Sequence, residues 1–157
     1  MRTFPMTING AKQLQDELER LKTIERPAVI AAIAEARSHG DLSENAEYDA
    51  AKNKQAFIEG RIADIEAKLS RSEIIDPSTI NSDGRVVFGA TVSLLDLDNE
   101  LKISYQIVGD DEADIKQSKI SVNSPVAKSL IGKKIGSIVE VHAPSGVKEY
   151  EILGFFL

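Results

Sequence analysis

The stretch Ser38-His39-Gly40-Asp41-Leu42-Ser43-Glu44 (SHGDLSE) separates two segments of helical composition and decides the fold of the first half. Gly40 stands where a helix needs a left-handed residue after its C-terminus. Asp41 or Ser43 can serve as the N-cap of a following helix. A short connection between two amphipathic helices produces an antiparallel hairpin. We therefore expect one helical arm on each side of this stretch.

Both flanking segments carry apolar residues at the spacing of a helix that packs against another helix. The recurring positions, four and three residues apart, are Leu14, Leu18 and Leu21 before the turn and Ile58, Ile62, Ile65 and Leu69 after it. Such seams predict that the two arms, each about 45 Å long, pair as a coiled coil. Thr7 is expected to cap the first helix, and Pro27 is expected to kink or break it because proline lacks an amide donor.

From residue 76 onward the composition is typical of a β domain. Segment 76–84 is rich in turn residues and predicts a linker. Strands are expected at 85–97, 101–108, 119–122, 137–142 and 147–156. Gly89 should mark a bulge or break in the first strand, and Ser124 with Pro125 should begin a short helix.

This pattern predicts an α+β protein of two domains. The first is an antiparallel coiled-coil helical hairpin over residues 1–76. The second is a small antiparallel sheet with one helix over residues 85–157, joined to the hairpin by a linker at 77–84.

Composition excludes several classes of function. The chain has 19 Lys and Arg against 25 Asp and Glu, a net charge of −6, which argues against stand-alone binding to nucleic acid or to an anionic membrane. Without cysteine it cannot form disulfides or thiolate metal sites. Phosphate-loop, dinucleotide-binding and nucleophile-elbow motifs are absent. The longest apolar run, Ala28–Ala34, is too short to cross a membrane, and we expect a cytoplasmic protein.

Asp41 and Glu44, at the expected tip of the hairpin, have two interpretations. As the N-cap and the third residue of the second helix, they would form a capping arrangement. As two carboxylates at the end of a long hairpin, they would supply oxygen ligands to Mg²⁺ while a partner provides the rest of its shell. Such a tip is not a complete active site, but it can complete the active site of another protein.

Three residues near the tip are candidates for contact with a nucleic acid strand. Arg37 and Lys52 could neutralise phosphates, and Tyr48 could stack on a base. The alternatives are ordinary surface charge for the two cations and packing across the hairpin for the tyrosine. Surface charge is the interpretation that we favour for Lys54.

An acidic run in the second half consists of Asp110, Asp111, Glu112 and Asp114. It could suggest a calcium site, but it lacks the alternating spacing, the central glycine and the terminal glutamate of an EF-hand loop. A solvated turn is the favoured interpretation.

Six runs of residues, spread over the whole chain, form a recognisable set. They are Pro5-Met6-Thr7 with Gly10, Arg26-Pro27 with 29–37 (VIAAIAEAR), 40–48 (GDLSENAEY), 57–62 (FIEGRI), 108–114 (VGDDEAD) and 120–125 (ISVNSP). Together these runs resemble the Gre family of bacterial transcript cleavage factors. The resemblance favours the metal-binding interpretation of the tip, although capping and metal binding do not exclude each other.

The resemblance implies a second domain similar to FKBP-type prolyl isomerases and a function in transcription. Gre factors bind RNA polymerase at the mouth of its secondary channel, and their hairpin reaches the active centre of a backtracked enzyme. The polymerase then cleaves its own RNA, so that the factor is an activator and not an enzyme. Prolyl isomerase activity itself is suggested only by fold analogy, and the aromatic residues of this domain are dispersed among different strands.

The resemblance also implies roles for individual residues. Asp41 and Glu44 match the two tip acids that help to hold the second magnesium ion of the polymerase, and no metal is expected on the free protein. Arg37 and Lys52 match a basic patch that faces the backtracked RNA 3′ end. The patch is small, which favours the branch of the family linked to short cleavage fragments. The candidates for docking on polymerase are Asp110, Asp111, Glu112, Ser121, Asn123, Ser124 and Pro125.

A monomer without affinity for membranes is expected. The main alternative is a non-cleaving family member that occupies the channel and inhibits transcription. The retained tip acids favour activation. A bare coiled-coil structural protein would leave the second domain and the polar tip unexplained.

Overall fold

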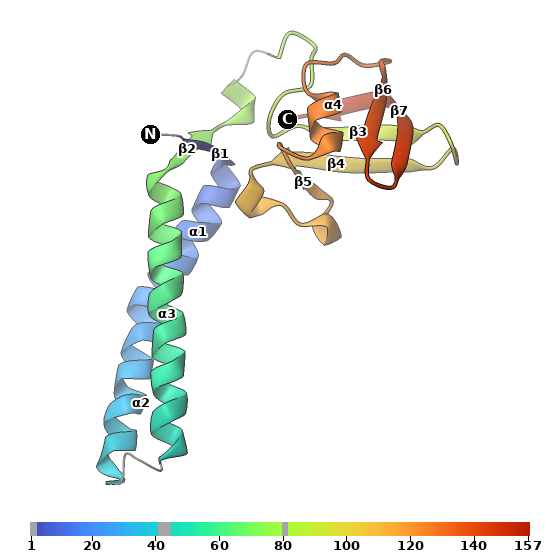
Figure 1. The fold of residues 1–157 in the computed structure, drawn as a ribbon. Helices are drawn as coiled ribbons and strands as arrows, with labels where there is room; N and C mark the ends of the chain where they lie inside the picture. The colour runs from blue at the N-terminus through green and yellow to red at the C-terminus, as the bar shows by residue number, and fades with distance from the viewer. Residues whose placement is uncertain (1–2, 41–44, 80–81) are drawn as a thin grey trace. The chain divides into compact units, whose positions relative to one another are not determined.

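The computed structural model describes residues 3–40, 45–79 and 82–157. These residues form two compact units, one made of Ala11–Ser72 and the other of Thr3–Gly10 together with Glu73–Leu157. The first unit is a helical hairpin and the second is built on a sheet (Figure 1), which confirms the α+β class. That residues 77–84 act as a linker between two independently folding units stays a prediction.

Two antiparallel arms make up the hairpin (Figure 1). The first arm contains α1 (Ile8–Arg20) from Ala11 onward, a π-helical segment (Leu21–Glu25) and α2 (Arg26–Ser38), and the second arm is α3 (Ala46–Ser70). The interface between the arms buries Leu21, Val29, Ile58, Ile62 and Ile65, with Leu14, Leu18 and Leu69 packed against them. The coiled-coil pairing expected from the apolar spacing is therefore confirmed.

The hydrogen-bond pattern of the first arm changes immediately before Pro27. Pro27 lies in the first turn of α2, where a missing amide donor is tolerated. In the π-helical segment before it, the amide of Arg26 donates to the carbonyl of Leu21, the longer-range bond that defines a π-helix. The break expected at Pro27 is thus a local change of helix type, and the arm continues through it.

The residues that end α2 and begin α3 suit the backbone conformation at those positions. Gly40 follows α2 with φ +96°, which confirms the left-handed position expected for it. The N-cap of α3 is Asn45, whose side chain accepts from the amide of Tyr48. The expectation that Asp41 or Ser43 caps this helix is wrong, because α3 begins only at Ala46. Asp41 and Glu44 themselves lie outside the described residues.

The main sheet of the second unit has the strand order β5-β4-β3-β7-β6. Its strands are β3 (Thr91–Asp96), β4 (Lys102–Val108), β5 (Lys119–Ser121), β6 (Ile138–Ala143) and β7 (Gly146–Phe156). Neighbouring strands pair antiparallel, except that β5 runs parallel to β4. Parallel neighbours cannot be joined by a tight hairpin, and here two 3₁₀ turns, Asp110–Glu112 and Ile115–Gln117, connect β4 to β5.

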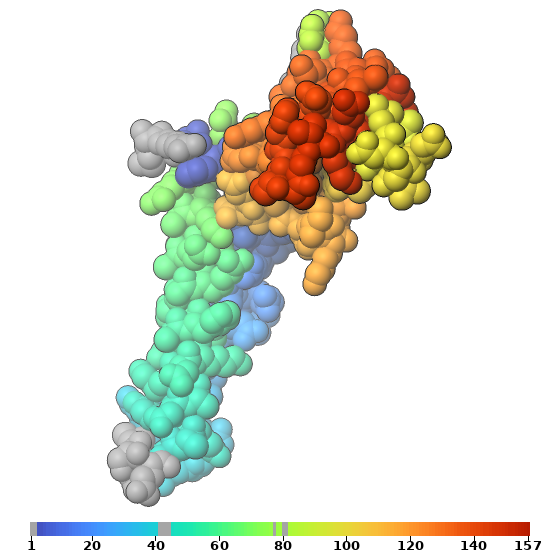
Figure 2. All heavy atoms as spheres, turned by 45° about the vertical axis from the view of Figure 1, so that its right-hand side comes forward, coloured from blue at the N-terminus to red at the C-terminus, as the bar shows by residue number. Residues whose placement is uncertain are grey.

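The short helix α4 (Pro125–Leu130) packs into the core of this sheet. Fully buried residues include Val86, Leu94, Ile107, Leu130 and Ile152. The hydroxyl of Ser124 accepts from the amide of Ala127, as expected for the N-cap of this helix. The turn after β3 lies beside β7, yellow next to red in Figure 2, where the amide of Leu97 donates to the carbonyl of Glu149.

Two features of the second unit differ from the sequence-based expectation. The strand expected over 85–97 begins only at Thr91. The break expected at Gly89 is confirmed, because the chain turns there with φ +87°. In addition, β1 (Phe4–Thr7) and β2 (Ser72–Ile75) form a separate two-stranded sheet. Both of its strands are edges, which is where the proline of β1, Pro5, can be accommodated.

Candidate functional site at the hairpin tip

Asn45 connects the end of α2 with the start of α3. Its side-chain nitrogen Nδ2 donates to the carbonyl of Ala36 at 2.7 Å, and its oxygen Oδ1 accepts from the amide of Tyr48 at 3.1 Å. Asparagine is among the best N-cap residues. Sequence analysis missed this residue, although an N-cap type of residue directly before the run Ala46-Glu47-Tyr48 was a signal that could have identified it.

Two further side-chain contacts cross the hairpin at the same end. The guanidinium carbon of Arg37 lies 6.0 Å from the centroid of the Tyr48 ring, which is the outer range of a cation–π contact. Nδ1 of His39 lies 3.3 Å from a carboxylate oxygen of Glu47. Tyr48 therefore has a partner on the opposite arm, as the packing alternative expected, and is half-buried.

A hollow of about 230 Å³ lies between α2 and α3 close to the tip. It is lined by Ile30, Ile33, Ala34, Arg37, Lys52 and Gln55. The two cations that the sequence singled out thus border one recess, although they come from different arms. Nζ of Lys52 donates to Oε1 of Gln55 at 3.2 Å, while the apolar floor and Gln55 were not anticipated.

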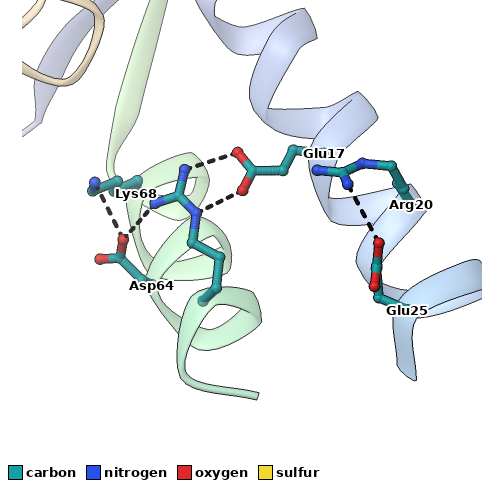
Figure 3. A network of polar contacts seen from close by, with 6 residues as sticks. Glu17, Arg20, Glu25, Asp64 and Lys68 are labelled. Carbon is teal, nitrogen blue, oxygen red and sulfur yellow. Dashed lines mark hydrogen bonds and ion pairs between the residues drawn. The ribbon is translucent and has the colours of Figure 1, made fainter. Parts of the chain in front are cut away.

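Ion pairs fix the two arms to each other farther from the tip. Arg61 on α3 makes a bidentate pair with Glu17 on α1, at 2.7 and 2.8 Å, and also binds Asp64 at 3.0 Å. Figure 3 shows Glu17 reaching across from the first arm, and Lys68 approaching Asp64 from the same helix. The hydrogen bonds from Arg61 lower the pKa of Glu17 despite the opposing effect of burial.

A second bidentate pair joins Arg26 to Glu59, at 2.8 and 2.7 Å. It lowers the pKa of the Glu59 carboxyl, chiefly through the hydrogen bonds from Arg26. Bidentate pairs fix relative orientation as well as distance. The hairpin is therefore held by oriented polar contacts as well as by its apolar seam.

Three of the docking candidates in the second unit form one hydrogen-bonded group. Asp110 accepts from the hydroxyl of Ser121 and, at 3.0 Å, from Nδ2 of Asn123. Ser124 caps α4 and Pro125 is its first residue. Asp111 lies in the same 3₁₀ turn as Asp110.

Glu112, the remaining docking candidate, is occupied by a structural contact inside the second unit. Its carboxylate accepts from the amide of Thr7 at 2.7 Å and from the hydroxyl of Thr7 at 2.5 Å. Oδ1 of Asp114 accepts from the amide of Lys116. The acidic run is therefore more than a solvated turn, since most of its carboxylates organise the local backbone or neighbouring side chains.

Within residues 3–40, 45–79 and 82–157, no group of three or more His, Asp or Glu side chains is arranged to hold a metal ion. Over the same ranges, no helix combines the length and the apolar character needed to cross a membrane.

Comparisons with known proteins identify the family. Residues 4–74 match the family described as "Transcription elongation factor, N-terminal", and residues 81–155 match "Transcription elongation factor, GreA/GreB, C-term". The transcription elongation factor GreA of Alkalilimnicola ehrlichii is 59% identical, with 98% of this chain and 97% of that protein covered. The GreA of Neisseria meningitidis serogroup A is 60% identical at the same coverage. The solved structure of GreA factor homolog 1 from Thermus thermophilus is 28% identical and covers 99% of this chain and 100% of its own, with a TM-score of 0.45. The chain belongs to the GreA/GreB family of transcription elongation factors.

Proposed function

We propose that this protein binds RNA polymerase at its secondary channel and stimulates the polymerase's own cleavage of backtracked RNA. Membership of the GreA/GreB family and about 60% identity to proteins named GreA support this function. The protein is an activator and not the catalyst, because the phosphodiester bond is broken in the active centre of the polymerase.

The observation that carries the proposal is the N-cap of α3. Asn45 occupies that position, so that Asp41 and Glu44 are not required as caps of this helix. Two carboxylates near the end of a hairpin are suited to Mg²⁺, which takes oxygen ligands and accepts one or two carboxylates when a partner completes its shell. Asp41 and Glu44 are the residues that would hold the ion, together with the polymerase. A bound second magnesium ion activates water and neutralises developing charge in phosphodiester cleavage.

The hollow between the arms supports a role in holding the extruded RNA. Arg37 and Lys52 border it from opposite arms, and both are exposed cations that can neutralise phosphates. Tyr48 lies under the guanidinium of Arg37. A base would therefore have to stack on the other face of the tyrosine ring or displace the arginine.

Docking on polymerase is assigned to the second unit. Asp110, Ser121 and Asn123 present one hydrogen-bonded group, with Ser124 and Pro125 next to it in sequence. Glu112 contributes to docking indirectly, because its carboxylate is already bound to Thr7. We propose that the protein acts as a monomer in the cytoplasm.

Cleavage of RNA in a stalled, backtracked elongation complex tests this function. Addition of the full chain should release a short 3′ RNA fragment and restart elongation in the presence of magnesium. A chain that binds the complex, releases no fragment and slows elongation would instead be the inhibiting type of family member.

A further inference from the structure

The side chain of Asn45 links two backbone groups that lie on either side of the segment carrying Asp41 and Glu44. The carbonyl of Ala36 lies in the last turn of α2, and the amide of Tyr48 lies in the first turn of α3. Helix ends leave such groups without the usual partner four residues away. The carbonyl of Ala36 also accepts from the amide of His39, at 3.3 Å. Asn45 binds both, at 2.7 Å and 3.1 Å.

The orientation of the Asn45 amide follows from its two partners. A carbonyl can only accept and a backbone amide can only donate, so Nδ2 must face Ala36 and Oδ1 must face Tyr48. The opposite orientation would lose both hydrogen bonds. Asn45 is half-buried and Ala36 is buried, with 2% of its surface exposed.

We propose that Asn45 is the positioning residue for the tip acids, an inference that rests on the proposed cleavage function. Asn45 sets the separation between the last turn of α2 and the first turn of α3, and thereby the span that the chain from Gly40 to Asn45 must bridge. The other cross-tip contacts are less suited to this role. The pairs Arg37–Tyr48 and His39–Glu47 join side chains that are at least partly exposed, whereas both bonds of Asn45 go to backbone atoms.

Positioning matters because a ligand that is displaced by about 1 Å can cost about a hundredfold in rate. Asn45→Ser separates positioning from capping. Serine is also a good N-cap, so that the bond to Tyr48 can be kept. Its short hydroxyl cannot donate to Ala36 at the same time, and it adds no charge near the tip. Asn53→Ser, an exposed asparagine on the same helix, is the matched control.

Two measurements on the full chain test the proposal. In the free protein, hydrogen exchange of the Tyr48 amide should stay slow in Asn45→Ser and become fast in Asn45→Ala, because only alanine removes the cap. In the backtracked complex, at saturating factor, Asn45→Ser should cleave about tenfold more slowly and need more magnesium for half-maximal cleavage. Asn53→Ser should match the wild type in both measurements.

The outcomes separate the proposal from the function on which it rests. Wild-type cleavage and magnesium dependence in Asn45→Ser, with cleavage lost in Asp41→Asn, would overturn the positioning role alone. Normal cleavage in Asp41→Asn and Glu44→Gln would overturn the assignment of the tip acids to the metal and the positioning role with it. A wild-type chain that stimulates no cleavage would overturn the proposed function itself. A defect of Asn45→Ser that disappears at saturating factor would place Asn45 in polymerase binding and would also contradict the proposal.

Discussion

Glu112 accepts hydrogen bonds from both the amide and the hydroxyl of Thr7, a residue 105 positions earlier in the chain. Thr7 is buried, and its hydroxyl also accepts from the amide of Gly10 at 3.0 Å, which confirms it as the N-cap of α1. The N-terminal segment is therefore part of the second unit through specific polar contacts. A Cβ on Gly10 would overlap the carboxylate of Glu112, so that a larger residue at position 10 would displace this carboxylate from Thr7.

Removal of the Glu112 carboxylate should destabilise the protein. Glu112→Ala leaves the amide of Thr7 without its acceptor, and we expect a loss of about 1–3 kcal/mol in the free energy of unfolding. Urea denaturation measures this loss, with the exposed Glu73→Ala as control.

The sign of a second substitution makes the Glu112 test sharper. In the wild type, Gly10→Ala should destabilise, because the new methyl group displaces Glu112. In the Glu112→Ala background the same change should stabilise by about 0.5–1 kcal/mol, since alanine is the better helix former. An equal effect in both backgrounds would contradict the contact.

The pair of Arg61 and Glu17 should make stability depend on pH in the acid range. The pKa of Glu17 in the folded protein lies below its usual value of 4.5. A lowered folded-state pKa gives stability that is present above the unfolded-state pKa and is lost as the pH falls through the folded-state pKa. At pH 7 the free energy of unfolding of the wild type should exceed that of Glu17→Gln by up to about 1 kcal/mol. In urea denaturation at a series of pH values, this difference should shrink below about pH 4.5. Glu35→Gln, an exposed carboxylate on α2, is the control, and a difference that does not change with pH would argue against the ion pair.

The two units should lose stability separately if they fold independently. Ile65 and Leu130 are fully buried in different units, and truncation of either to alanine should cost about 2–5 kcal/mol. Hydrogen exchange along the full chain should accelerate in residues 11–72 for Ile65→Ala, and in the sheet strands for Leu130→Ala. Acceleration throughout the chain by either variant would show one cooperative unit and would refute the proposed linker at 77–84.

Loss of both cations at the hollow should weaken contact with extruded RNA. Arg37→Ala with Lys52→Ala should lower crosslinking of the protein to the RNA 3′ segment in backtracked complexes. Each phosphate contact to a single strand contributes about 0.7 to the magnitude of the slope of log affinity against log salt. Loss of two contacts should therefore reduce the magnitude of this slope by roughly 1.4. The pair Lys12→Ala with Lys54→Ala removes the same charge from exposed positions outside the hollow. If this control lowers crosslinking equally, general charge and not the hollow holds the RNA.

Local sequence signals predicted much of this fold. The seam residues, the left-handed Gly40 and the Ser124 cap each depend on neighbours within one or two helical turns, and each was confirmed. Arg37 and Lys52 were also identified from the sequence. That they border the same hollow could not be, because this depends on how the two arms pair.

Features that depend on distant parts of the chain could not be predicted. Several residues between Asp41 and Asn45 can cap a helix, and the bond from Asn45 to Ala36 forms only when the arms meet. The strands β1 and β2 contain four residues each and pair across almost the whole hairpin sequence. Nothing local to Glu112 indicates that Thr7 is its partner.

Cleavage by Asp41→Asn tests the central claim most directly. Asparagine keeps the shape of aspartate but is a poor magnesium ligand, and the cap of α3 is supplied by Asn45. We predict a folded protein that competes with wild type for polymerase and cleaves roughly a thousandfold more slowly, the equivalent of about 4 kcal/mol. Added magnesium should partly restore the rate. Near-normal cleavage by a well-folded Asp41→Asn protein would contradict the assignment of the tip acids to the metal.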